Sequence, residues 1–150
     1  MASLIKTPEE IERIRVSGKI LASILRKLKD IVKPGVSLLE LDKLAHDLIL
    51  REGGKPAFLG YHPQGAKNKF PYTLCASVNE TIVHGLPSLY RLQASDMLKL
   101  DLGVSWHGGI TDAAISVPIG KISKELSHLL KTTKNALNEA IRVVKAGHTV

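Results

Sequence analysis

Apolar residues recur every three or four positions in the first part of the chain, and this spacing predicts a long amphipathic helix over residues 8–31. Its start is marked by Thr7-Pro8-Glu9-Glu10, a capping box with proline in the first turn. Lys33-Pro34-Gly35 then ends the helix. A second capping box, Ser37-Leu38-Leu39-Glu40, opens a helix predicted over about 38–51.

The middle of the chain has a different pattern. Pro56 to Pro71 is rich in proline and polar residues and predicts a long loop, and loops of this length inside a compact domain are often functional. Thr73 to Val78 and Thr81 to His84 follow, and both have the composition of short strands.

Period-two alternation marks Met97 to Val104, and Ile110 to Val117 follows it after the turn Trp106-His107-Gly108-Gly109. These segments predict a β-hairpin. Ser123 can cap a last helix with an apolar face. Helices that flank an antiparallel sheet place the chain in the α+β class.

The hairpin carries two aspartates, Asp101 and Asp112. With a turn centred between Trp106 and His107 they would lie directly opposite each other, with Cβ atoms about 4.5–5.5 Å apart. Two buried carboxylates at that distance need a proton or a cation between them, and the small neighbours Gly103 and Ala114 leave room for an ion. Carboxylates can also bridge two metal ions in a hydrolase. An exposed hairpin face with two solvated aspartates fits the spacing equally well.

His84 and Cys75 are the other residues with possible chemistry. His84 precedes Gly85, and near a metal-bound water an imidazole can hold a substrate or move a proton. A lone histidine is, however, more often a structural side chain. Cys75 is expected to be a small buried residue, because no partner for a thiol mechanism accompanies it.

Composition narrows the setting of the protein. The 150 residues include a single cysteine, which excludes an internal disulfide and favours a reducing, cytoplasmic compartment. No apolar stretch approaches the roughly 20 residues that a membrane span needs. The net charge of +7 fits an anionic neighbour such as nucleic acid or the ribosome surface, but a role in solubility is the preferred explanation. Because the basic residues are scattered and only 4% of residues are aromatic, no specific nucleic-acid binding is expected.

Several motifs together resemble type I methionine aminopeptidase over about Leu4 to Val150. The motifs are the aspartate pair of the hairpin and five short segments: Ile5-Lys-Thr-Pro-Glu-Glu-Ile11, Val32-Lys-Pro-Gly-Val-Ser37, Gly60-Tyr-His62, Cys75-Ala-Ser-Val-Asn-Glu80 and Ile82-Val-His-Gly-Leu-Pro87. The resemblance implies the pita-bread form of the α+β class, in which two related halves surround a dinuclear metal site.

The resemblance also implies roles for individual residues. Asp101 would chelate one of two divalent metal ions, and Asp112 would bridge both. The ions would be cobalt, manganese, iron or zinc. His84 would contact the substrate near the scissile bond. The pocket for the methionine side chain would be lined by Phe58, Tyr61 and Cys75.

The function implied is removal of the initiator methionine from nascent polypeptides when the second residue is small. The family's remaining metal ligands, one histidine and two glutamates, and a second catalytic histidine lie in its C-terminal half. Residues 1–150 are therefore expected to be the N-terminal half of the catalytic domain, truncated at its C-terminus and inactive without the missing half. The alternatives are a non-catalytic pita-bread module that binds peptides or proteins, and another pita-bread metallopeptidase, such as a proline-specific one.

Overall fold

Two capped helices open the structure, a computed structural model that describes residues 5–149. Helix α1 spans Pro8–Ile31 and helix α2 spans Leu38–Arg51, which confirms both predicted helices. In α1, Thr7 Oγ1 accepts a hydrogen bond from the Glu10 amide (3.2 Å), and the Glu10 carboxylate accepts one from the Thr7 amide (2.8 Å). Ser37 and Glu40 form the same reciprocal pair at the start of α2. Local sequence alone thus determines where both helices begin.

A four-stranded antiparallel sheet is built around the long strand β3, Met97–Trp106. Strand β4, Gly109–Pro118, pairs with β3 along its whole length. The other edge of β3 pairs with β2, Leu74–Val78, and then with the short β1, Lys55–Pro56. The predicted hairpin is confirmed, whereas β1 falls at the start of the segment predicted as loop.

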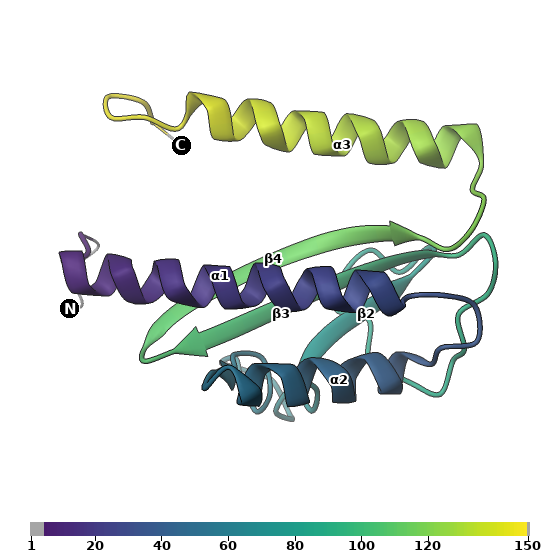
Figure 1. Ribbon diagram of the computed structural model, residues 1–150, viewed down its shortest axis with the longest axis horizontal. Coiled ribbons are helices and arrows are strands. Elements are labelled where there is room, and N and C mark those ends of the chain that lie inside the picture. Colours follow the sequence, from purple (N-terminus) through teal and green to yellow (C-terminus); the bar gives the residue numbers. More distant parts are fainter. Residues whose placement is uncertain (1–4, 150) are drawn as a thin grey trace.

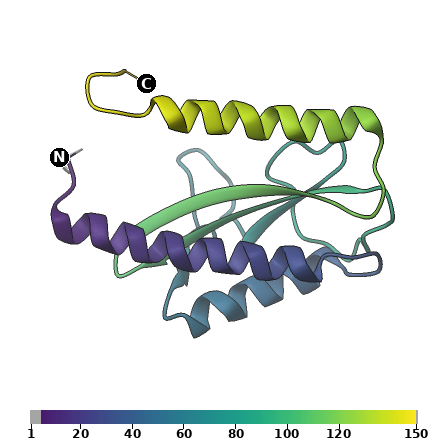
Figure 2. The same cartoon turned by 45° about the horizontal axis from the view of Figure 1, so that its top comes forward.

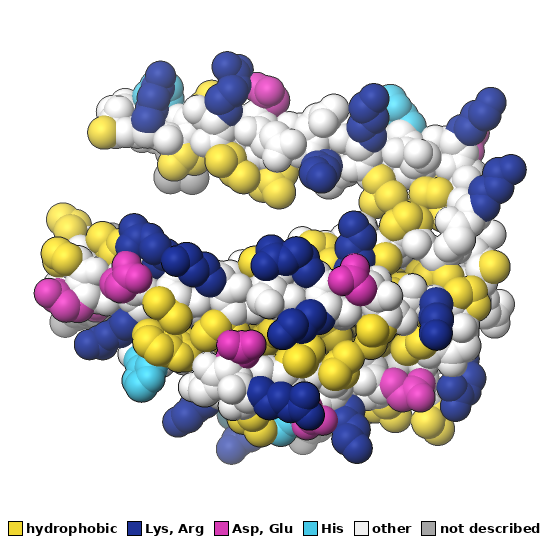
Figure 3. Space-filling view, in the orientation of Figure 1, with side chains coloured by type: hydrophobic (Ala, Val, Ile, Leu, Met, Phe, Trp, Pro, Cys, Tyr) yellow, Lys and Arg dark blue, Asp and Glu magenta, His cyan; other side chains and the backbone are white. Residues whose placement is uncertain are grey.

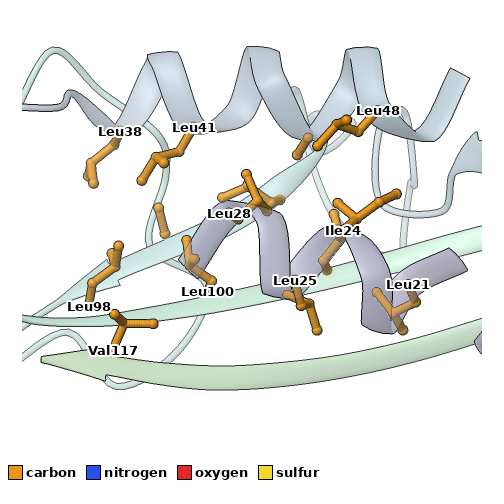
Figure 4. Close-up of a cluster of buried hydrophobic side chains, with 14 of the residues drawn as sticks. Leu21, Ile24, Leu25, Leu28, Leu38, Leu41, Leu48, Leu98, Leu100 and Val117 are labelled. Atoms are coloured by element: carbon orange, nitrogen blue, oxygen red, sulfur yellow. The ribbon is translucent and has the colours of Figure 1, made fainter. Parts of the chain in front are cut away.

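One face of the sheet packs against α1 and α2 (Figure 1). The alternate residues of β3 that point to this side are completely buried: Leu98, Leu100, Leu102 and Val104. Figure 4 shows Leu98 and Leu100 beneath the apolar faces of both helices. Burying one such side chain stabilises the fold by about 1.5–3 kcal/mol, so this layer fixes which face of β3 points inward.

Residues 81–84, predicted as a short strand, form an irregular segment instead. Ile82 and Val83 are 80% and 60% exposed, so their apolar character does not reflect burial in a sheet. His84 has a left-handed backbone (φ +59°), which a β-strand does not tolerate. The strand prediction was wrong because composition in so short a segment does not reveal where its backbone hydrogen bonds go.

The last helix, α3, spans Lys124–Val143 and stands away from the sheet (Figures 1 and 2). Within residues 5–149, none of its side chains is buried. Hydrophobic side chains lie along its lower side in Figure 3, across an open gap from α1. Three apolar side chains of this face are each about 60% exposed to solvent: Leu129, Leu137 and Ile141. This face is suited to packing against a further element.

Helices α1 and α3 end in the same turn, in the segments Val32–Val36 and Val144–His148. Each contains a glycine with positive φ, +92° at Gly35 and +88° at Gly147. In each, the amide after the glycine donates to the carbonyl of the lysine three residues earlier, at 3.3 Å and 3.2 Å. The turn forms both at a helix that packs on the sheet and at one that does not, so it is specified locally.

Strand β4 leaves one edge without a strand partner among residues 5–149. A groove of about 540 Å³ lies between β4 and α1, with Leu21, Leu25 and Ile115 among its lining residues. No helix in the described range is long and apolar enough to cross a membrane.

We expect residues 1–150 to self-associate through the apolar face of α3. Leu137→Lys should weaken this association, because it places a charge in the middle of that face. Thr132→Lys adds the same charge on a different side of the helix and is the matched control. Sedimentation velocity over a range of protein concentrations measures the effect. A monomer at every concentration would contradict the prediction.

Candidate active site

The turn of the hairpin determines which residues face each other across β3 and β4. His107 and Gly108 have φ values of +46° and +85°, as the two central residues of a type I′ turn require. The last pair before the turn is Trp106 with Gly109. Asp101 therefore pairs with Ala114, and Asp112 pairs with Gly103. The predicted direct opposition of the two aspartates was wrong by two residues, because the turn lies one residue further along the chain.

Contacts with α1 explain this register. A side chain at position 109 would lie 2.5 Å from the backbone of Arg13, so only glycine fits beneath the helix there. One turn further along α1, the Ser17 hydroxyl donates to the Val104 carbonyl (2.9 Å) and also contacts the Thr111 hydroxyl (2.9 Å). The helix thus fixes both strands at the Val104–Thr111 pair.

Asp101 and Asp112 still share one face of the hairpin, since a shift of two residues preserves the side to which a strand residue points. Such diagonal neighbours are about 7–8 Å apart, within reach of each other's side chains. The pKa of Asp101 is raised to about 6, first by burial and then by the charge of Asp112 and a hydrogen bond with it. His84 acts in the opposite direction on the same carboxyl. The pair is therefore suited to binding a proton or a cation.

All six residues that the sequence singled out line one cavity of about 560 Å³. Cys75, Asp101 and Asp112 come from the sheet, Phe58 and Tyr61 from the loop after β1, and His84 from the segment after β2. A cavity of this size accommodates the end of a peptide. The sequence predicted these residues one by one, and the fold brings them together.

The loop between β1 and β2 forms one wall of the cavity. It folds back on itself through two hydrogen bonds, from the Gly60 amide to the Phe70 carbonyl and from the Phe70 amide to the Tyr61 carbonyl, both 2.8 Å. The Phe58 and Phe70 rings meet edge to face, with centroids 6.4 Å apart. Phe70 was not among the residues predicted from the sequence, although an aromatic residue within a polar loop was a usable signal.

Gly103 does not leave space for an ion, contrary to the expectation from its small size. A side chain at this position would lie 2.6 Å from the Phe58 ring and 2.9 Å from Ala57 Cβ. The space above Gly103 is occupied by the loop, which crosses β3 at this point. The Ala57 amide donates to the Gly103 carbonyl (3.0 Å) and holds the loop there.

Cys75 is buried beside Asp101, its register partner on β3. Burial raises the pKa of its thiol to about 11, and the negative charges of Asp101 and Asp112 add to the effect. The thiol therefore remains protonated at neutral pH and presents a small uncharged surface to the cavity. This matches the expectation of a buried cysteine without nucleophilic chemistry.

The aspartate pair does not form a complete metal site by itself. Within residues 5–149, no three side chains of histidine, cysteine, aspartate or glutamate come together to hold a metal ion. A divalent cation bound between Asp101 and Asp112 would need further ligands from water or from another part of the protein.

Comparisons with known proteins agree with this geometry. The profile of metallopeptidase family M24 matches residues 12–150. A methionine aminopeptidase of Helicobacter pylori is 43% identical over 147 residues, which cover 98% of this chain and 56% of that protein. One of Aquifex aeolicus is 39% identical over 151 residues, or 100% of this chain and 58% of that protein.

The crystal structure of a methionine aminopeptidase from Thermotoga maritima superposes with a TM-score of 0.88 at 32% identity, covering 94% of this chain and 55% of that one. The α+β architecture is thus that of the pita-bread fold. The chain spans about half the length of the relatives it matches.

The raised pKa of Asp101 predicts a pH-dependent stability. The folded-state value, about 6, exceeds the value of about 3.9 for an unfolded aspartate, so the folded state binds this proton more tightly. The stabilisation from this proton is present below about pH 4 and is lost as the pH rises through about 6. The free energy of unfolding of the Asp101→Asn variant should therefore increase relative to that of the unchanged protein as the pH rises from 4.5 to 7.

Urea unfolding at the two pH values, in buffer with a chelator, measures this change. Asp112→Asn should reduce the pH dependence of stability that arises from Asp101, because it removes the charge next to that carboxyl. A carbon NMR titration of Asp101 with a midpoint near pH 4 would contradict the prediction.

Proposed function

Because the chain belongs to metallopeptidase family M24, we propose that the protein removes N-terminal methionine from nascent polypeptides whose second residue is small. The observation that carries this proposal is the cavity that gathers Asp101, Asp112, His84 and an aromatic wall. The methionine aminopeptidases that match this chain support the choice of substrate. A non-catalytic binding module would have no need for the repelling pair of carboxylates.

The aspartate pair is suited to holding divalent metal ions. Asp101 is half-buried and shares one face of the hairpin with the exposed Asp112. Burial, and after it the charge of Asp112, raises the pKa of Asp101. Asp101 and Asp112 would hold two divalent ions, of cobalt, manganese, iron or zinc, with Asp112 shared between them. Such ions lower the pKa of a bound water and polarise the peptide carbonyl.

His84 would contact the substrate. It lines the cavity, and its charge acts on Asp101, so the ring lies near the carboxylate pair. Since the side chain is exposed, it remains free to bond to a peptide. In the proposed mechanism the imidazole holds the peptide group next to the scissile bond and moves a proton during its cleavage.

Phe58, Tyr61 and Cys75 would bind the methionine side chain. Aromatic rings make favourable contacts with a thioether sulfur, worth about 0.3–1.5 kcal/mol. The protonated Cys75 thiol adds a neutral surface next to the rings. The pocket would therefore select a long, unbranched and uncharged side chain.

The described residues supply two carboxylates, and a hard cation needs about six ligand atoms. We therefore infer that ligands outside residues 1–150 complete the site. The resemblance to methionine aminopeptidases implies that these are one histidine and two glutamates, together with a second catalytic histidine. Residues 1–150 would act as the N-terminal half of the catalytic domain. The substrate would be a nascent chain in the cytoplasm, and the net charge of +7 favours a place near the anionic ribosome.

Residues 1–150 alone should release no methionine from Met-Ala-Ser in the presence of manganese or cobalt. The same residues completed by a C-terminal half, from their own reading frame or from the Helicobacter pylori relative, should release it. A chelator should abolish this activity. Full activity of the 150-residue chain would show that the ligand count is wrong, and an inactive completed form would refute the proposed function.

In the completed form, His84→Ala should lower kcat by about 100-fold or more with little change in bound metal, as expected when a group that moves a proton is lost. His46→Ala is the matched control, because His46 lies on α2, across the sheet from the cavity. Peptide kinetics and metal analysis on the same samples measure both quantities. Loss of metal with an unchanged rate per bound ion would make His84 a ligand instead.

A further inference from the structure

The segment that carries His84 is fixed at both of its ends. We call residues 79–85 the His84 arc. At its start, the Asn79 amide donates to the Met97 carbonyl, and the Asn79 side-chain oxygen accepts from the Met97 amide, both at 2.9 Å. At its end, the Gly85 carbonyl accepts a hydrogen bond from the Ala76 amide (2.8 Å). The position of the arc over the sheet therefore depends on these two anchors.

Ser77 strengthens the second anchor. Its hydroxyl accepts a hydrogen bond from the Gly85 amide (3.0 Å), so both polar groups of the Gly85 backbone are bound to β2. Ser77 is only 2% exposed. Because strand residues alternate, it lies on the same face of β2 as Cys75, which lines the cavity. A buried hydroxyl thus holds the residue next to His84.

The approach of the arc to β2 leaves no space for adjustment. A side chain at position 85 would lie 2.4 Å from the Ala76 carbonyl oxygen and 2.8 Å from Ser77 Cα. The Gly85 backbone is therefore in direct contact with the strand. If the hydrogen bond from Gly85 to Ser77 were lost, this end of the arc would be held by one backbone bond.

His84 depends on this contact because it has little support of its own. Its side chain is exposed, and its backbone adopts the left-handed conformation (φ +59°), which is uncommon for residues other than glycine. Such a conformation persists where neighbouring contacts determine it. The next residue, Gly85, supplies those contacts through β2.

We propose that Ser77 is a positioning residue for His84: its buried hydroxyl holds the Gly85 amide, and this bond sets the imidazole beside Asp101 and Asp112. The inference rests on the proposed function, in which His84 contacts the substrate. Ser77 does not line the cavity, so its effect on turnover would pass through His84.

A double-mutant cycle in the completed form tests this dependence. Ser77→Ala should lower kcat about tenfold or more, the size of effect expected from a misplaced catalytic group, with a smaller change in KM and with bound metal retained. In a His84→Ala background the same substitution should change kcat by less than about twofold. Ser77→Thr, which keeps the hydroxyl, should restore most of the rate.

Ser88→Ala is the matched control. Ser88 also uses its hydroxyl to hold a nearby amide, that of Tyr90 (3.2 Å), but it is exposed and lies beyond the arc. Its removal should leave kcat unchanged. Should Ser77→Ala fail to fold, Ser77→Cys keeps nearly the same volume and replaces the oxygen acceptor with a weak sulfur acceptor.

A second readout needs no activity. In residues 1–150 with a chelator present and at one fixed pH, Ser77→Ala should speed exchange of the Gly85 amide hydrogen about tenfold or more. It should also move the NMR signals of the His84 ring, while Ser88→Ala leaves both unchanged.

The outcomes distinguish a failure of the positioning role of Ser77 from a failure of the proposed aminopeptidase function. If Ser77→Ala lowers kcat equally with and without His84, Ser77 has a general structural role and the inference is wrong. It is equally wrong if Ser77→Ala changes neither the Gly85 exchange rate nor the His84 signals. If the completed form releases no methionine from any peptide, the proposed function fails, and the NMR comparison alone decides whether Ser77 positions His84.

Discussion

The apolar face of β3 packs against α1 and α2, and this packing decides what the other face of the strand can carry. Leu98, Leu100 and Leu102 have no exposed surface, so the strand cannot rotate or slip by one residue without losing them from the core. Lys99 and Asp101 must then point to the opposite side. The candidate site is thus a consequence of the hydrophobic core, since the core determines the side on which Asp101 appears.

The opposite face of the sheet brings together groups that are unfavourable without a partner. Asp101 is half-buried next to a second carboxylate, and its pKa rises to about 6. A structure without a use for this pair would gain stability by replacing one aspartate. The pair lines a cavity with aromatic walls, and its carboxylates are suited to binding divalent metal ions there.

Helix α3 and the free edge of β4 show that the described residues do not satisfy all of their own packing surfaces. The helix is amphipathic and its start is capped by Ser123, yet its apolar side contacts no core. It also ends in the same Val-Lys-x-Gly turn as α1, which packs on the sheet. The two helices therefore share their end signal and differ in whether a partner covers their apolar face.

The sequence alone predicted the elements whose signals are local. The capping boxes at Thr7 and Ser37, the Lys33-Pro34-Gly35 turn after α1, and the alternation of the hairpin each involve residues a few positions apart, so the neighbouring sequence is sufficient to specify them. The same holds for the selection of Asp101, Asp112 and His84, which rested on short motifs.

The tertiary structure decided what depends on residues distant in the chain. The hairpin register was one such feature, because α1 fits closely over Gly109 and bonds to Val104 through Ser17. Another was the path of the His84 arc, which is held by hydrogen bonds from Gly85 to β2 and from Asn79 to β3. The space above Gly103 was also decided in this way, since Phe58 occupies it. Contacts between distant segments arise only when the whole chain packs, so local patterns could name the site residues but not their arrangement.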